Sequence, residues 1–569
     1  MRLIEVRLLD GPNLYRLEPV VKLEVAVGRR RTWYGKRDPE PYNLIRLSAA
    51  VPAGAQPARI AALAAWVTRL RREHPDGAEG RVLVHRSSDP GFWILSWPWL
   101  LGDRAREVAE TAFALVERDL PIAKRPRPSG ARRRVLERVD ERIERATGAG
   151  PSWIRDADRR MPVVSISGTN GKTTTTRLTA HILRTAGRRV GATTSDGIVV
   201  GDELIEKGDW TGPGGAQSIL RRDDLDMAVL ETARGGILLR GMGYESNEAS
   251  VITNVSSDHL DLQGIHTLPE LAEVKGVIAR VTKPTGTVVL NADDRWVAAL
   301  AREVRAPVAF FSLEGDRSAL VRRHVRKGGR AYVVRDGWIG EAESAAWRRF
   351  APLADVPIAL GGIARHNVAN ALAAAGAARA MGVSIEAVGA GLRSFRPTAE
   401  DAPGRLNVFK DDRRIVIVDF AHNEAGITVL LDVAAAMAST AKGSITAIIG
   451  TAGDRPDDTL RGLGRIAAQR ADRVVIKETL EYLRGRSRAS TIGELKAGTR
   501  EGGWRREIPV FASEVESLEH ELDRTGDGPP EVIVLLCHEQ RDAVYGLLTL
   551  RGFTQVGDHR ELAKLVAAP

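Results

Sequence analysis

A glycine-rich stretch between two expected regular elements carries the strongest chemical signal in the sequence. A β-branched run that begins at Val163 leads into Gly168-Thr169-Asn170-Gly171-Lys172-Thr173-Thr174, and a helical pattern follows over 175–186. Such a loop directs backbone N–H groups and a helix N-terminus at one point, which suits a phosphate group. Lys172 would then hold the β- and γ-phosphates of a nucleotide, and the Thr173 hydroxyl would bind Mg²⁺. The same pattern would also fit a purely structural turn between a buried strand and a helix.

Two further polar positions follow strands that are expected downstream of this loop. Glu231 ends the apolar run 227–230, and His259 follows Asp258 after the strand expected over 250–255. The carboxyl ends of parallel strands meet at one edge of a sheet, where such sheets bind ligands. We therefore expect Glu231 and His259 to lie near the loop as metal ligands. Taken alone, each would more often be a solvated strand end or a structural histidine.

Length and composition describe an ordinary soluble protein of several domains. A chain of 569 residues is too long for one core, and no apolar run approaches membrane-spanning length. The N-terminus has no signal-peptide core, and the single Cys537 excludes an internal disulfide framework, so we expect a cytoplasmic protein. The net charge of +10 invites nucleic-acid binding, but the arginines are spread along the chain among 73 acidic residues. An anionic substrate would also benefit from this charge.

The pattern of expected elements predicts an α/β protein with three folded units and a linker. A small α+β domain is expected over 1–122, with the tryptophan-rich run 92–99 in its core. A basic linker and a short charged helix should occupy 123–155. Alternating strands and helices predict a parallel sheet over 156–396 and a Rossmann-like α/β domain over 397–569. The remaining ranges predicted are strands at 2–8, 21–27, 81–84, 287–290, 415–418, 445–449, 473–476 and 532–536, and helices at 57–73, 104–117, 131–146 and 268–281.

Seven motifs, in the order of the chain, resemble those of the Mur ligase family. They are GTNGKTT at 168–174, ETARGG at 231–236, TNVSSDHLD at 253–261, Lys275, ARHNVANALAA at 364–374, PGR at 403–405 and VDFAHN at 418–423. Within that family, ETARGGILLRG and SSDHLDLQGIHTLPELAEVKG are most similar to the ligase module of the cyanophycin synthetases. The opening LLDGPNLYRLEPVVKLEV is similar to their amino-terminal domain. Those enzymes carry an ATP-grasp module between the two parts, and only the segment near 120–160 separates them here.

The resemblance implies an ATP- and Mg²⁺-dependent ligase that activates a carboxylate as an acyl phosphate and joins it to an amine. Lys172, His259 and Lys275 are then the expected catalytic residues. Thr173 and Glu231 would hold one Mg²⁺ and His259 a second. Lys275 matches a lysine that many members carry as a carbamate, which makes it an anionic metal ligand.

The resemblance also implies contacts to ATP beyond the Gly168–Thr174 loop. Asn367 and Asn370 match a motif that contacts the nucleotide base, and three positions match residues that reach ATP from the third domain: Arg405, Asp419 and His422. Glu424 stands where the family's motif normally continues with proline. The amine site is expected in the third domain, where the candidates are Asp454, Arg455, Lys477, Arg484 and Arg486. Each of these candidates could equally be a solvated loop charge.

The expected partners are an amino acid or other amine and a carboxylate on a peptide or polymer. A homo-oligomer is expected because relatives of this module often assemble, and neither a membrane nor a nucleic acid is expected. A second hypothesis is a phosphate-loop ATPase with a regulatory or mechanical role. A third is a nucleic-acid-binding protein, and a fourth is a non-catalytic partner that retains ATP binding. Lys172, Glu231, His259 and Lys275 are all present, which argues against loss of catalysis.

Overall fold

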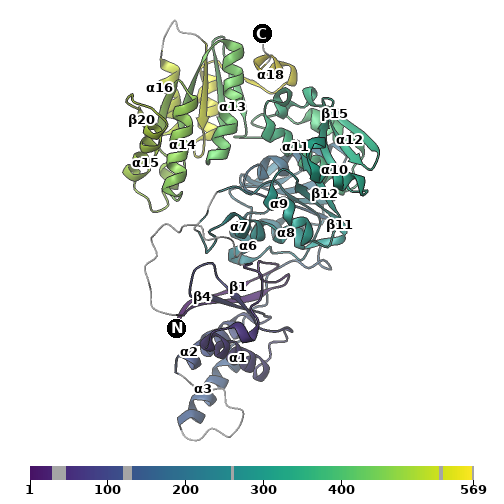
Figure 1. Ribbon diagram of the computed structural model, residues 1–569, viewed down its shortest axis with the longest axis vertical. Coiled ribbons are helices and arrows are strands. Elements are labelled where there is room, and N and C mark those ends of the chain that lie inside the picture. The colour runs from purple at the N-terminus through teal and green to yellow at the C-terminus, as the bar shows by residue number, and fades with distance from the viewer. Residues whose placement is uncertain (28–45, 119–130, 258–259, 261, 525–529, 567–569) are drawn as a thin grey trace.

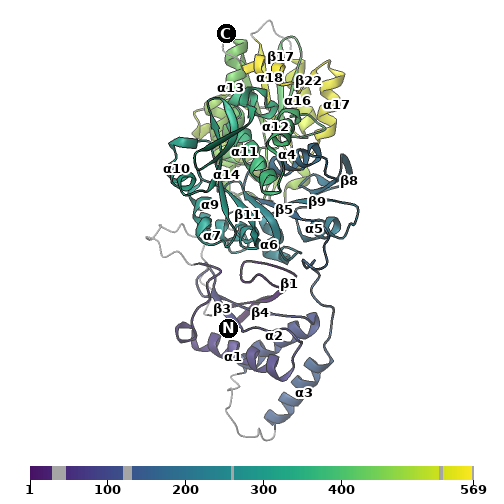
Figure 2. The same cartoon turned by 90° about the vertical axis from the view of Figure 1, so that its right-hand side faces the viewer.

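The computed structural model describes residues 1–27, 46–118, 131–257, 260, 262–524 and 530–566 (Figure 1). The described strands form three sheets of four, eleven and seven strands. These sheets follow one another along the long axis of the molecule, with the N-terminal sheet at one end (Figures 1 and 2). We name the N-terminal, central and C-terminal domains after them. The basic segment 124–130, predicted as a linker, lies outside the described residues.

The N-terminal domain is a small α+β unit, as the sequence predicts. Its antiparallel strands lie in the order β1 (Arg2–Leu9), β2 (Val20–Ala26), β4 (Phe92–Pro98) and β3 (Leu83–Arg86). Three helices accompany them, namely α1 (Ala58–Glu73), α2 (Gly102–Glu117) and α3 (Ala131–Arg145). Apolar residues at helical spacing on α1 face the sheet, and Trp93, Trp97 and Trp99 are buried in the same core, as expected.

The central sheet is parallel in its middle and antiparallel at both edges. Its strands lie in the order β15 (Ala346–Pro352), β14 (Trp338–Glu343), β13 (Arg330–Arg335), β12 (Val308–Ser312), β11 (Thr282–Asn291), β10 (Asn247–Ile252), β5 (Val163–Ser167), β9 (Met227–Glu231), β6 (Val190–Thr193), β7 (Gly197–Val200) and β8 (Glu203–Lys207). Pairing is parallel from β13 to β6. The hairpins that add β14, β15, β7 and β8 were not among the expected strands.

Helices cover both faces of the central sheet, so most of its strands are buried. They are α4 (Lys172–Thr185), α5 (Pro213–Leu220), α6 (Arg234–Arg240), α7 (Leu268–Lys275), α8 (Val277–Arg280), α9 (Arg295–Ala299), α10 (Ala319–Arg326), α11 (Arg365–Ala380) and α12 (Ile385–Ser394). Two boundaries differ from expectation. Helix α4 already begins at Lys172, and the helix expected over 268–281 is broken into α7 and α8 at Gly276.

The C-terminal domain is a second α/β unit. Its strands lie in the order β20 (Val510–Phe511), β19 (Arg473–Lys477), β18 (Ser444–Ile449), β21 (Glu531–Leu536), β17 (Arg414–Asp419), β16 (Asn407–Lys410) and β22 (Thr554–Val556). Pairing is parallel from β20 to β17. The helices are α13 (Glu424–Ala441), α14 (Asp457–Arg470), α15 (Arg488–Glu501), α16 (Glu514–Asp523), α17 (Arg541–Leu550) and α18 (His559–Val566).

Helix α13 is long and apolar enough to cross a membrane by length and composition alone. It packs against β18, β21 and α14, and its apolar side chains belong to the core of the C-terminal domain. Its composition is therefore explained by burial within the fold. The α/β fold class predicted from the sequence is correct, and the two larger sheets turn the carboxyl ends of their parallel strands toward a common cleft.

Candidate active site

A cleft of about 820 Å³ lies between the central and C-terminal domains. Its walls come from the loop before α4, the end of β9, the start of α11 and the segment after β17. This one cavity gathers most of the site residues predicted from the sequence. They are Thr169, Asn170, Gly171, Lys172, Thr173, Thr174, Glu231, Lys275, Asn367, Asn370, Arg405, Asp419, His422, Asp454, Arg455 and Arg484.

The loop over 168–174, which we call the phosphate loop, contains two glycines with positive φ. Gly168 has φ +150° and Gly171 has φ +84°. A Cβ on Gly168 would lie 1.8 Å from Thr253 Oγ1, and a Cβ on Gly171 would lie 2.2 Å from Asn370 Oδ1. Side chains are therefore excluded at both positions, and the backbone N–H groups beside Lys172 open toward the cleft at the N-terminus of α4. This geometry fits the phosphates of a nucleotide.

Hydrogen bonds from the end of β10 fix the shape of this loop. The Asn170 N–H donates to Asn254 Oδ1 at 2.9 Å, and Asn254 Nδ2 donates back to the Asn170 carbonyl at 2.9 Å. Thr253 Oγ1 donates to the same carbonyl at 2.7 Å. Because both backbone groups of Asn170 are engaged, the loop is pre-organised rather than shaped by a ligand.

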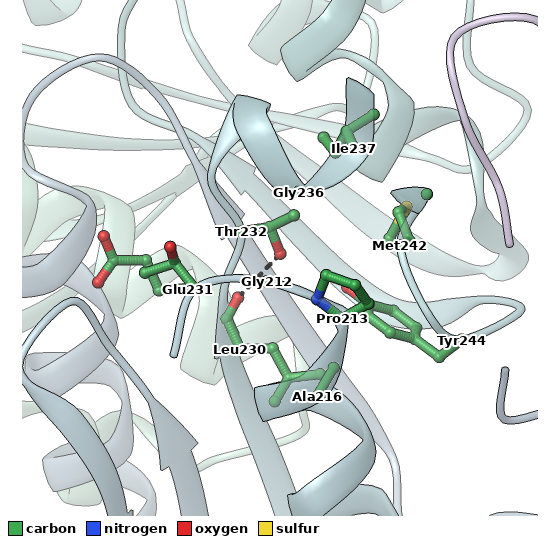
Figure 3. Close-up of a pocket in the computed structure, with 12 residues that line it drawn as sticks. Gly212, Pro213, Ala216, Leu230, Glu231, Thr232, Gly236, Ile237, Met242 and Tyr244 are labelled. Atoms are coloured by element: carbon green, nitrogen blue, oxygen red, sulfur yellow. Dashed lines mark hydrogen bonds between the residues drawn. The ribbon is translucent and has the colours of Figure 1, made fainter. Parts of the chain in front are cut away.

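Oxygen atoms converge beside the loop at the end of β9. Thr173 Oγ1 lies 3.1 Å from Ser195 Oγ, and the Ser195 N–H donates to Glu231 Oε2 at 3.3 Å. Burial raises the pKa of the Glu231 carboxyl, although the charge of Lys172 opposes this shift. In Figure 3 the Glu231 carboxylate points away from the small apolar pocket lined by Pro213 and Tyr244. A buried carboxylate beside a hydroxyl is a donor set that suits Mg²⁺ held together with a nucleotide.

The two remaining predicted metal ligands are His259 and Lys275. His259 lies outside the described residues. Lys275, the last residue of α7, is buried, and its Nζ donates to the Gly168 carbonyl at 2.7 Å. Among the residues that the structure describes, no three His, Cys, Asp or Glu side chains form a metal-binding group. Glu231 and the neighbouring hydroxyls of Thr173 and Ser195 are oxygen donors that lie together in the described chain.

The start of α11 forms the wall of the cleft next to Gly171. Asn370 Nδ2 donates to Asn367 Oδ1 at 3.1 Å, so these two predicted base-contacting residues form one buried pair. His366 lines the cleft beside them, and burial lowers its pKa to about 4. Its imidazole is therefore neutral near pH 7. His366 lies within the quoted ARHNVANALAA motif, yet sequence reasoning assigned it no role.

The C-terminal domain brings Arg405 against the phosphate loop. Arg405 Nη2 lies 3.4 Å from both Thr173 Oγ1 and Ser195 Oγ, and its guanidinium carbon lies 4.7 Å from the centre of the Phe420 ring. Asp419 accepts hydrogen bonds from the N–H groups of Leu406 and Ala421 at 2.7 and 2.8 Å. Burial nevertheless raises the pKa of Asp419, against the charge of Arg405. A cation from a second domain thus reaches the side of the cleft that contains Thr173 and Ser195.

His422, the remaining ATP-contacting candidate from the third domain, lines the same cavity. Its Nδ1 lies 3.1 Å from the Phe420 carbonyl. The next residue, Asn423, donates through Nδ2 to Asn170 Oδ1 at 2.9 Å and so reaches the phosphate loop directly. Sequence reasoning placed Asn423 in a motif but gave it no contact.

An ion-pair cluster that sequence reasoning missed also joins the two domains. Asp196 accepts from Arg541 Nη1 at 2.8 Å and from Arg177 Nη2 at 3.3 Å. Burial would raise the pKa of Asp196, but the charges of Arg405, Arg177 and Arg541 outweigh it and lower that pKa. Asp196 directly follows Ser195, so the cluster lies next to the side of the cleft that contains Thr173 and Glu231.

The five candidates for the amine site divide into two groups. Asp454, Arg455 and Arg484 line the cleft, and Arg484 Nη1 donates to Asp454 Oδ2 at 2.7 Å. Arg486 does not line it, because its guanidinium bonds the carbonyls of Gly453 and Arg455 at 2.8 and 3.0 Å.

Lys477 does not line the cleft either. Its Nζ donates to Glu514 Oε1 at 2.6 Å and lies 2.9 Å from His538 Nδ1, with no exposed side-chain surface. The Lys477 and Arg486 side chains therefore support the fold around the cleft.

Comparison with known families gives two matches in this chain. The model described as "Mur ligase middle domain" matches residues 166–378, and "Mur ligase, glutamate ligase domain" matches residues 404–536. Both matched segments contribute residues to the cleft.

Similar sequences include cyanophycin synthetase of Crocosphaera subtropica, which is 40% identical over 66% of this chain and 43% of its own length. The UDP-N-acetylmuramyl-tripeptide synthetase of Deinococcus radiodurans is 31% identical over 61% of this chain and 67% of its own length. The chain thus spans less than half of the first of these relatives. Among solved structures, E. coli FolC in complex with ADP has a TM-score of 0.50 at 20% identity, over 68% of this chain and 90% of its own, and so shares the fold.

Proposed function

This chain belongs to the Mur ligase family, and we propose from that premise that it is an ATP-dependent ligase that joins a carboxylate to an amine. One observation carries the proposal. A single cleft unites a pre-organised phosphate loop, the buried carboxylate of Glu231 and a guanidinium, Arg405, supplied by a second domain. An enzyme that transfers a phosphoryl group works mainly by positioning and charge neutralisation, which are the properties of this set.

The first step activates a poor electrophile. A carboxylate oxygen of the acceptor attacks the γ-phosphorus of ATP, the bond to the bridging oxygen breaks, and ADP leaves with that oxygen. Lys172 and the N–H groups at the start of α4 neutralise the charge that builds on the transferring group. Arg405 adds a second cation when the two domains meet.

The metal side of the site would be held by the chain's own oxygen donors. Thr173 and Glu231 would hold Mg²⁺, and the ion would supply positive charge that offsets the charge of the phosphates. Burial raises the pKa of Glu231, and a cation beside the carboxylate would favour its ionised form. His259 and Lys275 are proposed for a second metal position, and Lys275 lies against the loop at the Gly168 carbonyl.

The second step forms the amide bond. The unprotonated amine attacks the carbonyl carbon of the acyl phosphate, a tetrahedral intermediate collapses, and inorganic phosphate leaves while the amine loses a proton. We assign amine binding to the cleft wall that contains Asp454, Arg455 and Arg484. Arg455 and Arg484 suit the carboxylate of an amino acid, and Asp454 suits a cationic group. Asn367 and Asn370 are proposed to contact the base of ATP, and Asp419 and His422 the rest of the nucleotide.

The substrates proposed are an amino acid or other amine and a carboxylate on a peptide or polymer. The likeness to cyanophycin synthetase covers the ligase part of this chain and supports this class of acceptor. We further propose that the enzyme acts in the cytoplasm and assembles as a homo-oligomer.

Oxygen transfer from the acceptor tests the acyl phosphate directly. A peptide acceptor that supports turnover would be labelled with ¹⁸O in its carboxylate and incubated with ATP, Mg²⁺ and the amine. We expect one ¹⁸O atom in each phosphate released. Label that stays entirely in the peptide and its product would contradict the proposed mechanism.

A further inference from the structure

A tight turn on the cleft wall connects the active site with the N-terminal domain. The Ile265 N–H donates to the Leu262 carbonyl at 3.2 Å, which closes a turn over residues 262–265. Both central residues have positive φ, +59° at Gln263 and +74° at Gly264. Leu262 and Gln263 line the cleft. The turn therefore presents the exposed Gln263 side chain to the cavity.

The backbone of Gln263 is strained. Turns with two successive positive φ values favour glycine, asparagine and aspartate, because other side chains crowd the backbone there. Glutamine has no such tolerance, so its conformation must be imposed by its surroundings. Strain of this kind that persists beside a ligand cavity is a reason to look for a functional contact.

The N-terminal domain supplies two of the contacts that impose this conformation. Ser88 Oγ donates to the Gly264 carbonyl at 2.6 Å, at the tip of the turn. The Asp89 carboxylate lies 3.1 Å from His266 Nε2, one residue beyond the turn. Both contacts come from the short connection between β3 and β4.

The central domain holds the same turn from the other side. Arg234 Nη1 donates to the Leu262 carbonyl at 3.4 Å. The N–H groups of His266 and Thr267 donate to Glu270 Oε2 at 2.7 and 2.9 Å, in the capping box of α7. The turn is thus clamped between the cap of α7 and the N-terminal domain.

A second N-terminal contact fixes the neighbouring segment of the wall. The Asp10 N–H donates to the Arg240 carbonyl at 2.7 Å, and the Met242 N–H donates to the Pro12 carbonyl at 2.9 Å. Both bonds lie at the end of α6, the helix that begins with Arg234. Figures 1 and 2 show the N-terminal sheet directly beneath α6 and α7. The N-terminal domain therefore touches both segments that meet at Leu262.

We propose that the N-terminal domain positions this wall of the cleft, with Ser88 and Asp89 holding the turn in which Gln263 binds the carboxylate-bearing substrate. A primary amide both donates and accepts, so Gln263 suits the peptide groups of an acceptor chain. The substrate contact rests on the proposed function, whereas the positioning of the turn does not. Gln263 is the binding residue, and Ser88 and Asp89 are positioning residues.

Hydrogen–deuterium exchange tests the positioning without any substrate. In the full-length variant Ser88→Ala/Asp89→Ala, we expect amides of residues 262–267 to exchange about tenfold faster than in wild type, with amides of β5 unchanged. Ser48→Ala is the matched control, because Ser48 contacts Glu273 through its backbone N–H and keeps that bond. Unchanged exchange at residues 262–267 in the double variant overturns the proposal.

Steady-state kinetics with an aspartate-containing peptide acceptor test the assignment of Gln263. Gln263→Gly relieves the backbone strain but removes the amide, so we expect the KM for the peptide to rise about tenfold while the KM for ATP is unchanged. Gln263→Asn keeps an amide and tolerates positive φ, and should return the KM to within about threefold of wild type. The Ser88→Ala/Asp89→Ala variant should raise the same KM.

These outcomes separate the two proposals. An active wild type whose peptide KM is unaffected by Gln263→Gly overturns the substrate contact and leaves the ligase assignment standing. A wild type that forms no ADP with any acceptor overturns the ligase assignment and the substrate contact, while the exchange experiment still decides the positioning of the turn.

Discussion

Arg541 of the C-terminal domain donates a hydrogen bond of 2.8 Å to Asp196 of the central domain. Asp196 also pairs with Arg177 of α4, the helix that begins with Lys172. Its pKa is lowered despite burial, because three guanidinium groups surround it. The carboxylate is therefore ionised at any physiological pH and ties the position of the C-terminal domain to the helix behind the phosphate loop.

Arg541→Ala should weaken the coupling between the two domains. Asp196 would keep Arg177 but lose its hydrogen-bonded partner across the interface, so we expect the KM for ATP to rise about tenfold. Small-angle scattering with a non-hydrolysable ATP analogue should give a larger radius of gyration than for wild type. Lys207→Ala is the control, because Lys207 and Asp542 form an exposed pair across the same interface. Equal effects of the two substitutions would contradict a special role for Asp196.

Gly171→Ala should abolish nucleotide binding, because its Cβ would collide with Asn370 Oδ1. Gly187 is a matched control with φ +81° and no atom within 4 Å of an added Cβ. Gly187→Ala should cost only the strain of positive φ, about 1–2 kcal/mol in the free energy of unfolding. Calorimetric titration with ATP and Mg²⁺ distinguishes the two variants, and tight binding by Gly171→Ala would refute the loop geometry.

Glu231→Gln should stabilise the protein without nucleotide and remove its response to Mg²⁺. Burial raises the pKa of Glu231 above its ordinary value of 4.5, so the folded state holds this proton more tightly than the unfolded state. The stability that the protonated Glu231 contributes to the wild type is therefore lost as the pH rises from about 4.5 through the pKa of Glu231 in the folded state. The glutamine variant has no titratable group at this position and keeps its stability over this range. Melting temperatures measured against pH, with and without Mg²⁺ and ATP, test the prediction. A lower melting temperature for Glu231→Gln at pH 7 without ligands would count against it.

Lys477→Met should destabilise the fold rather than alter amine binding. Removing Lys477 leaves Glu514 buried without its cation, at a cost of about 3–5 kcal/mol in the free energy of unfolding. Lys477 also holds the pKa of Glu514 at about 2 against burial, so this pair contributes stability above about pH 4.5 that is lost as the pH falls toward 2. Urea unfolding measures this loss. The control is Arg461→Ala, which removes the exposed pair of Arg461 with Glu494 and should leave the free energy of unfolding almost unchanged. A folded, stable Lys477→Met with a raised amine KM would restore the substrate role.

The parts of the site that were predictable belong to short motifs or to the ends of plainly apolar strands. The glycines, lysine and hydroxyls of the phosphate loop are contiguous, and Glu231 ends a strand whose apolar pattern is plain. Asp196 and Arg541 are 345 residues apart, and no local pattern links an aspartate after one strand with an arginine at the start of a helix in another domain.

Lys477 has a buried partner that its position at a strand end does not reveal. It is the last residue of β19, the position where ligand-binding residues are expected. Its partner Glu514 is the first residue of helix α16, and only the tertiary structure brings the two together. The hairpin of β13 and β14 at the edge of the central sheet could have been predicted from the sequence. The dipeptide Asp336-Gly337 between these strands is typical of a tight turn. The break between α7 and α8 likewise coincides with a glycine, Gly276.

The proposed reaction consumes ATP to join a carboxylate to an amine. The most direct measurement is ADP release with Mg²⁺ across the amino acids, with aspartate- or glutamate-containing peptides as acceptors and Lys172→Ala as the inactive control. We predict ADP formation that requires both an acceptor peptide and an amine, yields one amide bond per ADP, and is lost in Lys172→Ala. ADP formation by wild type that is independent of both partners, or full activity in Lys172→Ala, would contradict it.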